Sequence, residues 1–161
     1  MTRAIPPIVI TAADHPESFR AVVELRRIVF GDEQRIALPR YEDPEDSFSL
    51  NLLATIDGWP VGTGRLTPAY ERVAVPTIAW VATLPEHRGQ GVGSAIVQAL
   101  IEEADELGFE KVYLNAQSHA LGMYERLGFE PVGKPQVIHG IPHQSMLRLR
   151  RQRSLGLKTQ G

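Results

Sequence analysis

The sequence predicts an α/β fold in which a central sheet is flanked by helices. Short apolar and β-branched runs alternate with segments of helical periodicity, in the order strand, helix, three strands, helix, strand, helix, two strands. A glycine-rich turn at residues 88–93 joins a strand-like run directly to an amphipathic helix. We expect the 161 residues to form one domain, with a core at about 8–150 and a basic, flexible tail at 151–161.

The first elements are a strand and a helix. Residues 8–11 form a β-branched run after two prolines, which predicts a strand. The helix is predicted to begin near Pro16, with Asp14 as its N-cap. Its apolar face comprises Phe19, Val22, Val23, Val29 and Phe30. The polar, acidic stretch 31–47 that follows contains prolines, and we expect it to lie on the surface.

Three strands follow this surface stretch. Residues 50–56 and 61–66 are strand-like, and the Asp-Gly pair between them is a strong hairpin signal. Residues 77–84 form the third strand, which Pro85 ends. That strand leads directly into the glycine turn.

The C-terminal half combines two helices with three strands. Helical spacing places six apolar residues on one face of the first helix: Val92, Ala95, Ile96, Ala99, Leu100 and Ala104. Gly108 ends this helix, and Gly128 ends a second helix at 121–127. Residues 112–114 form the strand between them. The segments 129–132 and 144–149 pair either as a terminal hairpin or as two strands of the sheet.

Composition excludes several classes of protein. A formal net charge of -2 gives no support for a nucleic-acid or membrane partner, and no apolar run approaches the roughly 20 residues of a membrane span. The N-terminus lacks the apolar stretch of a signal peptide, so the cytoplasm is the expected location. Because the chain has no cysteine, disulfides, thiolate catalysis and cysteine-bound zinc are excluded.

The glycine turn predicts a phosphate site, because backbone amides at a helix N-terminus converge on anions. A Walker A pattern needs a lysine after its last glycine, whereas Ser94 follows Gly93. A dinucleotide fingerprint needs a glycine or alanine where this chain has Ser94 or Ile96. The pattern that fits is Arg-x-x-Gly-x-Gly, which Arg88, Gly91 and Gly93 fill. A turn that merely reverses the chain is the other interpretation.

Residues 84–94 resemble the acetyl-coenzyme A turn of the GNAT N-acetyltransferases. About thirty residues later, Met-Tyr-Glu-Arg-Leu-Gly-Phe at 123–129 resembles the Phe-Tyr-x-x-x-Gly-Phe motif of the same family, with methionine in the phenylalanine place. The resemblance covers roughly residues 8–149. It implies the GNAT fold, a mixed central sheet with splayed middle strands flanked by helices on both faces, and acetyl-coenzyme A as the acyl donor.

The resemblance also implies where coenzyme A binds. Loop amides would hold the pyrophosphate, and backbone of the strand before the turn would pair with the pantetheine arm. Asn115 would either hydrogen-bond that arm or simply cap its strand. An amide near Val81 or Ala82 would polarise the thioester carbonyl. The cofactor-binding residues expected are Val81, Ala82, Thr83, Arg88, Gly89, Gln90, Gly91, Val92, Gly93, Ser94, Asn115 and Tyr124.

Tyr124 is the expected catalytic residue. A thiolate with a pKa of roughly 8.5 has to leave in this reaction, and a phenol with a pKa near 10 can donate a proton to it. By resemblance, the hydroxyl would lie beside the sulfur of coenzyme A. The alternative is a helix tyrosine that only packs against the sheet.

The general base and the acceptor pocket are less well defined. Many GNAT enzymes carry a glutamate on the strand before the turn, whereas residues 78–81 are Ile-Ala-Trp-Val. The remaining candidates are a water relay, an amine that arrives unprotonated, and the side chains of Glu33, His119, Glu42, Asp43, Glu45 and Asp46. The acidic run among them is either a solvated face or an attractor of a cationic amine. Arg26, Glu33 and His143 are expected to line the acceptor pocket.

Residues 25–34, 114–117 and 140–146 resemble a branch of small bacterial, ElaA-like GNAT proteins. The implied function is transfer of acetyl from acetyl-coenzyme A to a primary amine of a small molecule or peptide by direct attack. The alternatives are a non-catalytic module that binds or senses coenzyme A, and an acyl-homoserine-lactone synthase-like acyltransferase. No metal is expected, because Gly140 and Pro142 deny His139 and His143 a common helix. A homodimer is the commonest closed assembly.

Overall fold

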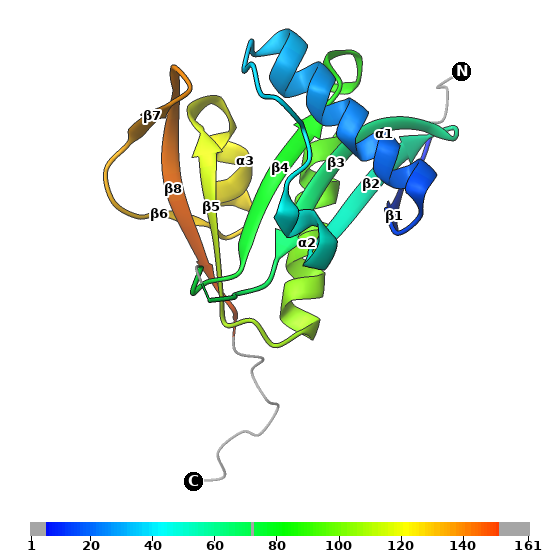
Figure 1. Ribbon diagram of the computed structural model, residues 1–161. Coiled ribbons are helices and arrows are strands. Elements are labelled where there is room, and N and C mark those ends of the chain that lie inside the picture. Colours follow the sequence, from blue (N-terminus) through cyan, green and yellow to red (C-terminus); the bar gives the residue numbers. More distant parts are fainter. Residues whose placement is uncertain (1–5, 72, 152–161) are drawn as a thin grey trace, which may run out of the picture.

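One mixed sheet organises the computed structural model, which describes residues 6–71 and 73–151 (Figure 1). The spatial order of the strands is β1-β2-β3-β4-β5-β8-β6, with β7 also paired to β8. Neighbouring strands are antiparallel except β4 and β5, which are parallel. The strands are β1 Ile8–Ala12, β2 Leu50–Ile56, β3 Trp59–Thr67, β4 Thr77–Thr83, β5 Lys111–Gln117, β6 Glu130–Pro131, β7 Gln136–Ile138 and β8 Ile141–Leu149.

Helices cover both faces of this sheet, as expected. Helix α1, Pro16–Arg26, lies on one face, whereas α2, Val92–Glu106, and α3, Leu121–Arg126, lie on the other (Figure 1). The strands show the same division. Leu52 packs into the larger core with α2, and its neighbour Leu53 packs into the smaller core with α1. Successive residues of a strand point to opposite faces, so β2 contributes to both cores.

The N-terminal helix differs from the prediction at both ends. Its N-cap is His15 rather than Asp14, and the His15 amide donates to the Ser18 hydroxyl at 3.2 Å. The helix does not reach Phe30 in regular form, because Arg27–Glu33 is a π-helix. Single π turns within helices are frequent at functional sites, and this one lies beside the cleft described below.

Most of the remaining predictions about elements are confirmed. Asp57 and Gly58 have φ values of 51° and 80°, as a two-residue type I′ hairpin turn requires. Strand β5 extends beyond the predicted 112–114. The two C-terminal segments are both strands of the sheet, since β6 and β8 pair directly. Sequence reasoning missed β7, which is only three residues long.

Within the described residues, no helix is long and apolar enough to cross a membrane. The predicted basic tail, apart from Arg151, lies outside the described residues.

Candidate active site

A cleft of about 1090 Å³ opens where β4 and β5 separate. It is lined from the α2 and α3 face by the glycine turn and Tyr124, and by β4 and β5 themselves. From the α1 face it is lined by parts of the segment 29–38 and by the turn between β7 and β8. The cleft therefore connects the two faces of the sheet, so two reactants can enter it from opposite sides.

The separation of the two strands follows from their pairing. They pair at a single position, Thr77 with Tyr113, and the Tyr113 amide donates to the Pro76 carbonyl at 2.9 Å. Beyond that point they diverge (Figure 1). The expected splayed middle strands are confirmed. Diverging parallel strands leave backbone donors and acceptors without a strand partner, which an extended ligand can use.

Backbone alternation on β4 identifies which groups face the gap. The Leu84 amide donates to the Val61 carbonyl on β3 at 2.9 Å. Backbone N–H and C=O groups on an antiparallel strand alternate in direction, so those of Thr83 and Val81 point away from β3 and toward the gap. Ala82 stands opposite Thr63, so its backbone groups lie on the β3 side. Val81 is thus the better candidate for a carbonyl-polarising amide.

The glycine turn forms an anion cradle at the start of α2. Gly89 and Gly91 have φ values of 77° and 85°, a conformation that side chains with a Cβ rarely adopt. In the described part of the chain, the amides of residues 89–94 donate no hydrogen bond to backbone, whereas the Ala95 amide bonds to the Gly91 carbonyl. Free amides at a helix N-terminus together with the helix dipole favour a phosphate.

The Arg88 side chain ties the start of this turn to the end of β4 and to the π-helix. Its guanidinium donates to the Thr83 carbonyl from Nε at 3.1 Å and from Nη2 at 3.0 Å, and it forms a two-point ion pair with Glu33. The Arg88 amide itself donates weakly to the Pro85 carbonyl at 3.4 Å, so it is less available to a ligand than its neighbours. Gln90 is exposed and lies outside the cleft lining.

Glu33 lies in the cleft, but its carboxylate is already engaged. Its hydrogen bond from Arg88 is the main reason that its pKa lies below the usual value. Burial opposes this shift, while the charges of Arg88 and His119 add to it. A carboxylate with a lowered pKa that is held by a guanidinium is a weak proton acceptor. Glu33 is therefore a poor candidate for the general base.

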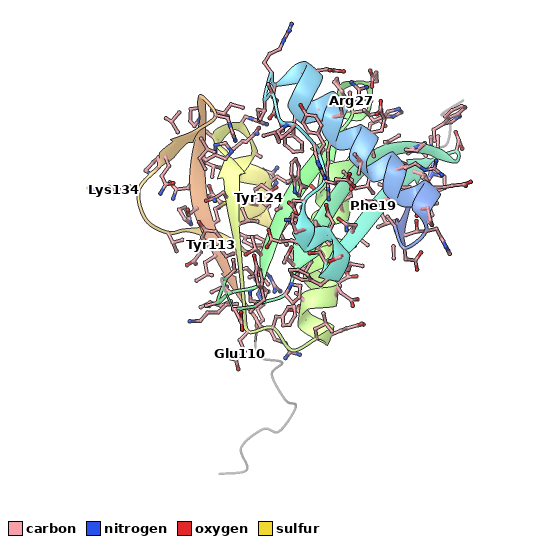
Figure 2. The ribbon with its side chains drawn as sticks, in the orientation of Figure 1. Phe19, Arg27, Glu110, Tyr113, Tyr124 and Lys134 are labelled. Carbon is pink, nitrogen blue, oxygen red and sulfur yellow. The ribbon has the colours of Figure 1, made fainter. Side chains whose placement is uncertain are left out.

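Tyr124 is buried on α3 and lines the cleft beside the gap (Figure 2). Its ring packs edge-on against Phe129 at a centroid distance of 5.9 Å. Among the described residues its hydroxyl has no hydrogen-bond partner. Burial raises the pKa of the phenol above its ordinary value, so the hydroxyl keeps its proton throughout the neutral pH range. This group is available to donate into the cleft.

Asn115 belongs to a small hydroxyl cluster on β5 and β8. Its Oδ1 accepts hydrogen bonds from the Tyr113 hydroxyl at 2.9 Å and from the Ser145 hydroxyl at 2.8 Å. Because the carbonyl oxygen is used, the amide NH2 is the part of Asn115 that remains for a ligand. Asn115 lines the cleft, whereas Tyr113 does not.

His143 lies on β8 opposite Gln117 and also lines the cleft. Its Nδ1 is 2.7 Å from the Ile141 carbonyl oxygen. Because a carbonyl can only accept, Nδ1 carries the hydrogen of this bond, and in the neutral ring Nε2 is then a free acceptor. His119 is exposed at the same cleft.

Arg26 does not line the acceptor pocket, contrary to the sequence-based expectation. It is fully buried, and its guanidinium donates to both carboxylate oxygens of Asp46, to Asn51 Oδ1 at 2.8 Å and to the Tyr41 carbonyl at 3.0 Å. It also stacks over the Trp80 ring, 4.8 Å from the centroid. Arg26 therefore contacts Trp80, which lines the cleft, without lining the cleft itself.

Most of the acidic run forms an ion-pair cluster around the buried guanidinium groups of Arg26 and Arg65 rather than a solvated face. Arg65, 4% exposed, pairs with Asp43 at 2.8 Å, Asp46 at 3.1 Å and Glu45 at 3.5 Å. Only Glu42 of the run makes none of these contacts and is exposed. Three of the four carboxylates are thus already compensated, and none of the four lines the cleft. They neither attract an acceptor amine within the cleft nor serve there as a base.

Two cleft features were not found from the sequence. Trp80 has a φ of 56° at a bulge in β4, and its indole Nε1 donates to Asp43 at 3.2 Å while Phe30 packs edge-on against it. The amides of Gln34 and Gln117 bond reciprocally at 2.9 and 2.8 Å, joining the π-helix end to β5. Glutamine and tryptophan carry no distinctive pattern in a single sequence, so contact alone reveals these features.

A split parallel pair beside an anion cradle, with a buried tyrosine lining the same cleft, defines an acyltransferase of the GNAT fold. The chain belongs to the acetyltransferase (GNAT) family, whose family model matches residues 18–129. Among relatives, YjcF of Bacillus subtilis, named as an uncharacterised N-acetyltransferase, is 27% identical over 84% of this chain and 96% of its own.

Solved structures share the fold of this chain. An acyl-CoA N-acyltransferase from Pseudomonas aeruginosa is 28% identical and has a TM-score of 0.77 over 89% of this chain and 99% of its own. Escherichia coli ElaA is 24% identical and has a TM-score of 0.76 over 88% of this chain and 99% of its own, which shows a shared fold. Within the described residues, no group of three or more potential ligand side chains could hold a metal ion.

Proposed function

We propose that this enzyme transfers the acetyl group of acetyl-coenzyme A to a primary amine by direct attack. The observation that carries the proposal is the cradle of unpaired amides at residues 89–94, which opens into the same cleft as Tyr124. The diphosphate binds these amides at the positive end of α2. The pantetheine arm then runs along the gap beside Val81 and Thr83 and ends near the phenol.

The cleft residues take separate roles in the reaction. The Val81 amide stabilises the oxyanion as the amine attacks the thioester carbonyl. Tyr124 donates its proton to the departing sulfur. Nε2 of His143 takes a proton from the amine, directly or through water, in place of the strand glutamate that this chain lacks. For each role, the amide or side chain has a hydrogen-bond donor or acceptor that no other group among the described residues uses.

Thiol release from acetyl-coenzyme A tests the proposal. The purified protein should release free thiol in the presence of an amine, and mass spectrometry should find the acetylated amine in equal amount. The panel should include amino acids, peptides, alkylamines, arylalkylamines and polyamines. Tight binding of coenzyme A without thiol release for any acceptor would instead identify a non-catalytic coenzyme A module.

A further inference from the structure

The half of the cleft on the α1 face, which we call the acceptor end, has an apolar lining. It lies across the gap from the glycine turn and Tyr124, on the face from which an acceptor would approach. Its apolar side chains come from the segment after α1, from the β4 bulge and from the β7–β8 turn: Phe30, Ile36, Leu38, Trp80, Ile138 and Ile141.

Charge at the acceptor end does not suit a polycation. Among the described residues that line the cleft, Glu33 is the only carboxylate, and Arg88 pairs with it. The other polar groups there include imidazoles, and the two glutamine amides satisfy each other. A second ammonium group on the acceptor would leave water without a free carboxylate to replace it. An anionic group would find Arg88 already paired with Glu33, while the other guanidinium that lines the cleft, Arg126, lies on α3 on the opposite face of the sheet.

Trp80 gives this surface a fixed shape. Its indole is held by a hydrogen bond to Asp43 at 3.2 Å, by the Arg26 guanidinium over its ring and by a T-shaped contact with Phe30. An aromatic side chain fastened from three directions loses little conformational entropy when a flat or branched apolar group packs against it. The wall is therefore preorganised for apolar contact.

We propose that the acceptor is a primary amine carried on an apolar body, aromatic or branched, rather than a polyamine, an aminoglycoside or an anionic amino acid. The inference rests on the proposed acetyl transfer and specifies its acceptor class. The apolar body packs among Leu38, Ile138 and Trp80, and the amine points into the gap toward the thioester. Burying the apolar body of one amine and not of another changes the ratio of their kcat/KM values by about tenfold to a few hundredfold.

Three probe amines test the inference: 2-phenylethylamine, 1,4-diaminobutane and 4-aminobutanoate. The value of kcat/KM for 2-phenylethylamine should exceed the other two by about tenfold or more. Ile138→Glu should lower it about tenfold, because the new carboxylate enters the acceptor end. The matched control is Val137→Glu, one residue away, where the side chain is 72% exposed and outside the cleft lining, so it should leave kcat/KM unchanged.

Calorimetry separates this inference from the proposed function. Binding of the same amines to the protein saturated with coenzyme A requires no chemistry, and 2-phenylethylamine should bind most tightly and lose affinity in Ile138→Glu. Acetylation that favours the diamine or the amino acid would overturn the apolar class while leaving acetyl transfer intact. If no amine is acetylated, acetyl transfer fails, and the calorimetric order of affinities alone upholds or overturns the apolar class.

Discussion

At the scale of single residues, the phenol of Tyr124 is the proposed proton donor. Tyr124→Phe removes the proton donor and keeps the ring that packs on Phe129. We expect kcat to fall by about 100-fold or more, while the Kd of coenzyme A stays nearly constant. Steady-state kinetics and calorimetry measure the two quantities. An unchanged kcat in Tyr124→Phe would remove the acid role.

His143 gives a second prediction for a single residue. His143→Gln keeps a polar side chain of similar length but has no ring nitrogen to take a proton, so kcat/KM should fall about tenfold or more. His119→Gln, at an exposed position of the same cleft, should change it much less. The same thiol-release assay compares them. Equal losses in both variants would contradict the assignment of His143 as proton acceptor.

At the scale of elements, sequence patterns predicted what is locally encoded. The strand–turn–helix order around the glycine turn, the Asp-Gly hairpin and the long middle helix all follow from short-range propensity. The roles of Arg26 and of the acidic run do not follow from short-range propensity. Nothing local indicates that Asp43 and Asp46 fold back onto Arg26 and Arg65, because these pairs are about twenty residues apart in sequence. β7 is too short to show periodicity.

The buried cluster that supports the β4 bulge makes an element-scale prediction. Arg26→Met leaves the Asp46 carboxylate and Asn51 buried with fewer partners, so the free energy of unfolding should fall by about 3–5 kcal/mol. Arg27→Met is the matched control. Its side chain is 44% exposed and pairs with Glu24 on the surface, which is worth about 0–1 kcal/mol. Urea unfolding measures both, and similar losses would contradict a structural role specific to Arg26.

At the scale of the whole molecule, the same cluster predicts acid sensitivity. Burial alone would raise the pKa of Asp46, but hydrogen bonds from Arg26, the Asp43 amide and Arg65, with the Arg26 charge, lower it from 3.8 to about 2. A carboxyl whose pKa is lower in the folded state stabilises the fold above its unfolded pKa. This contribution, about 2 kcal/mol, is lost as pH falls from about 4 toward 2.

Unfolding experiments in urea at pH values from about 6 to 3 test this linkage. The parent chain should lose stability more steeply with falling pH than Asp46→Asn, which has no carboxyl to protonate at that position. Parallel pH profiles for the two proteins would show that Asp46 does not carry the effect.

The central claim is that the main-chain amides at the head of α2 bind the diphosphate of coenzyme A. Calorimetry with coenzyme A and with pantetheine, which has the same arm but neither the diphosphate nor the adenosine beyond it, tests it most directly. Loss of two charge-assisted hydrogen bonds should make pantetheine bind about 100-fold more weakly or worse. Equal affinities for the two ligands, or no heat with coenzyme A, would contradict the account.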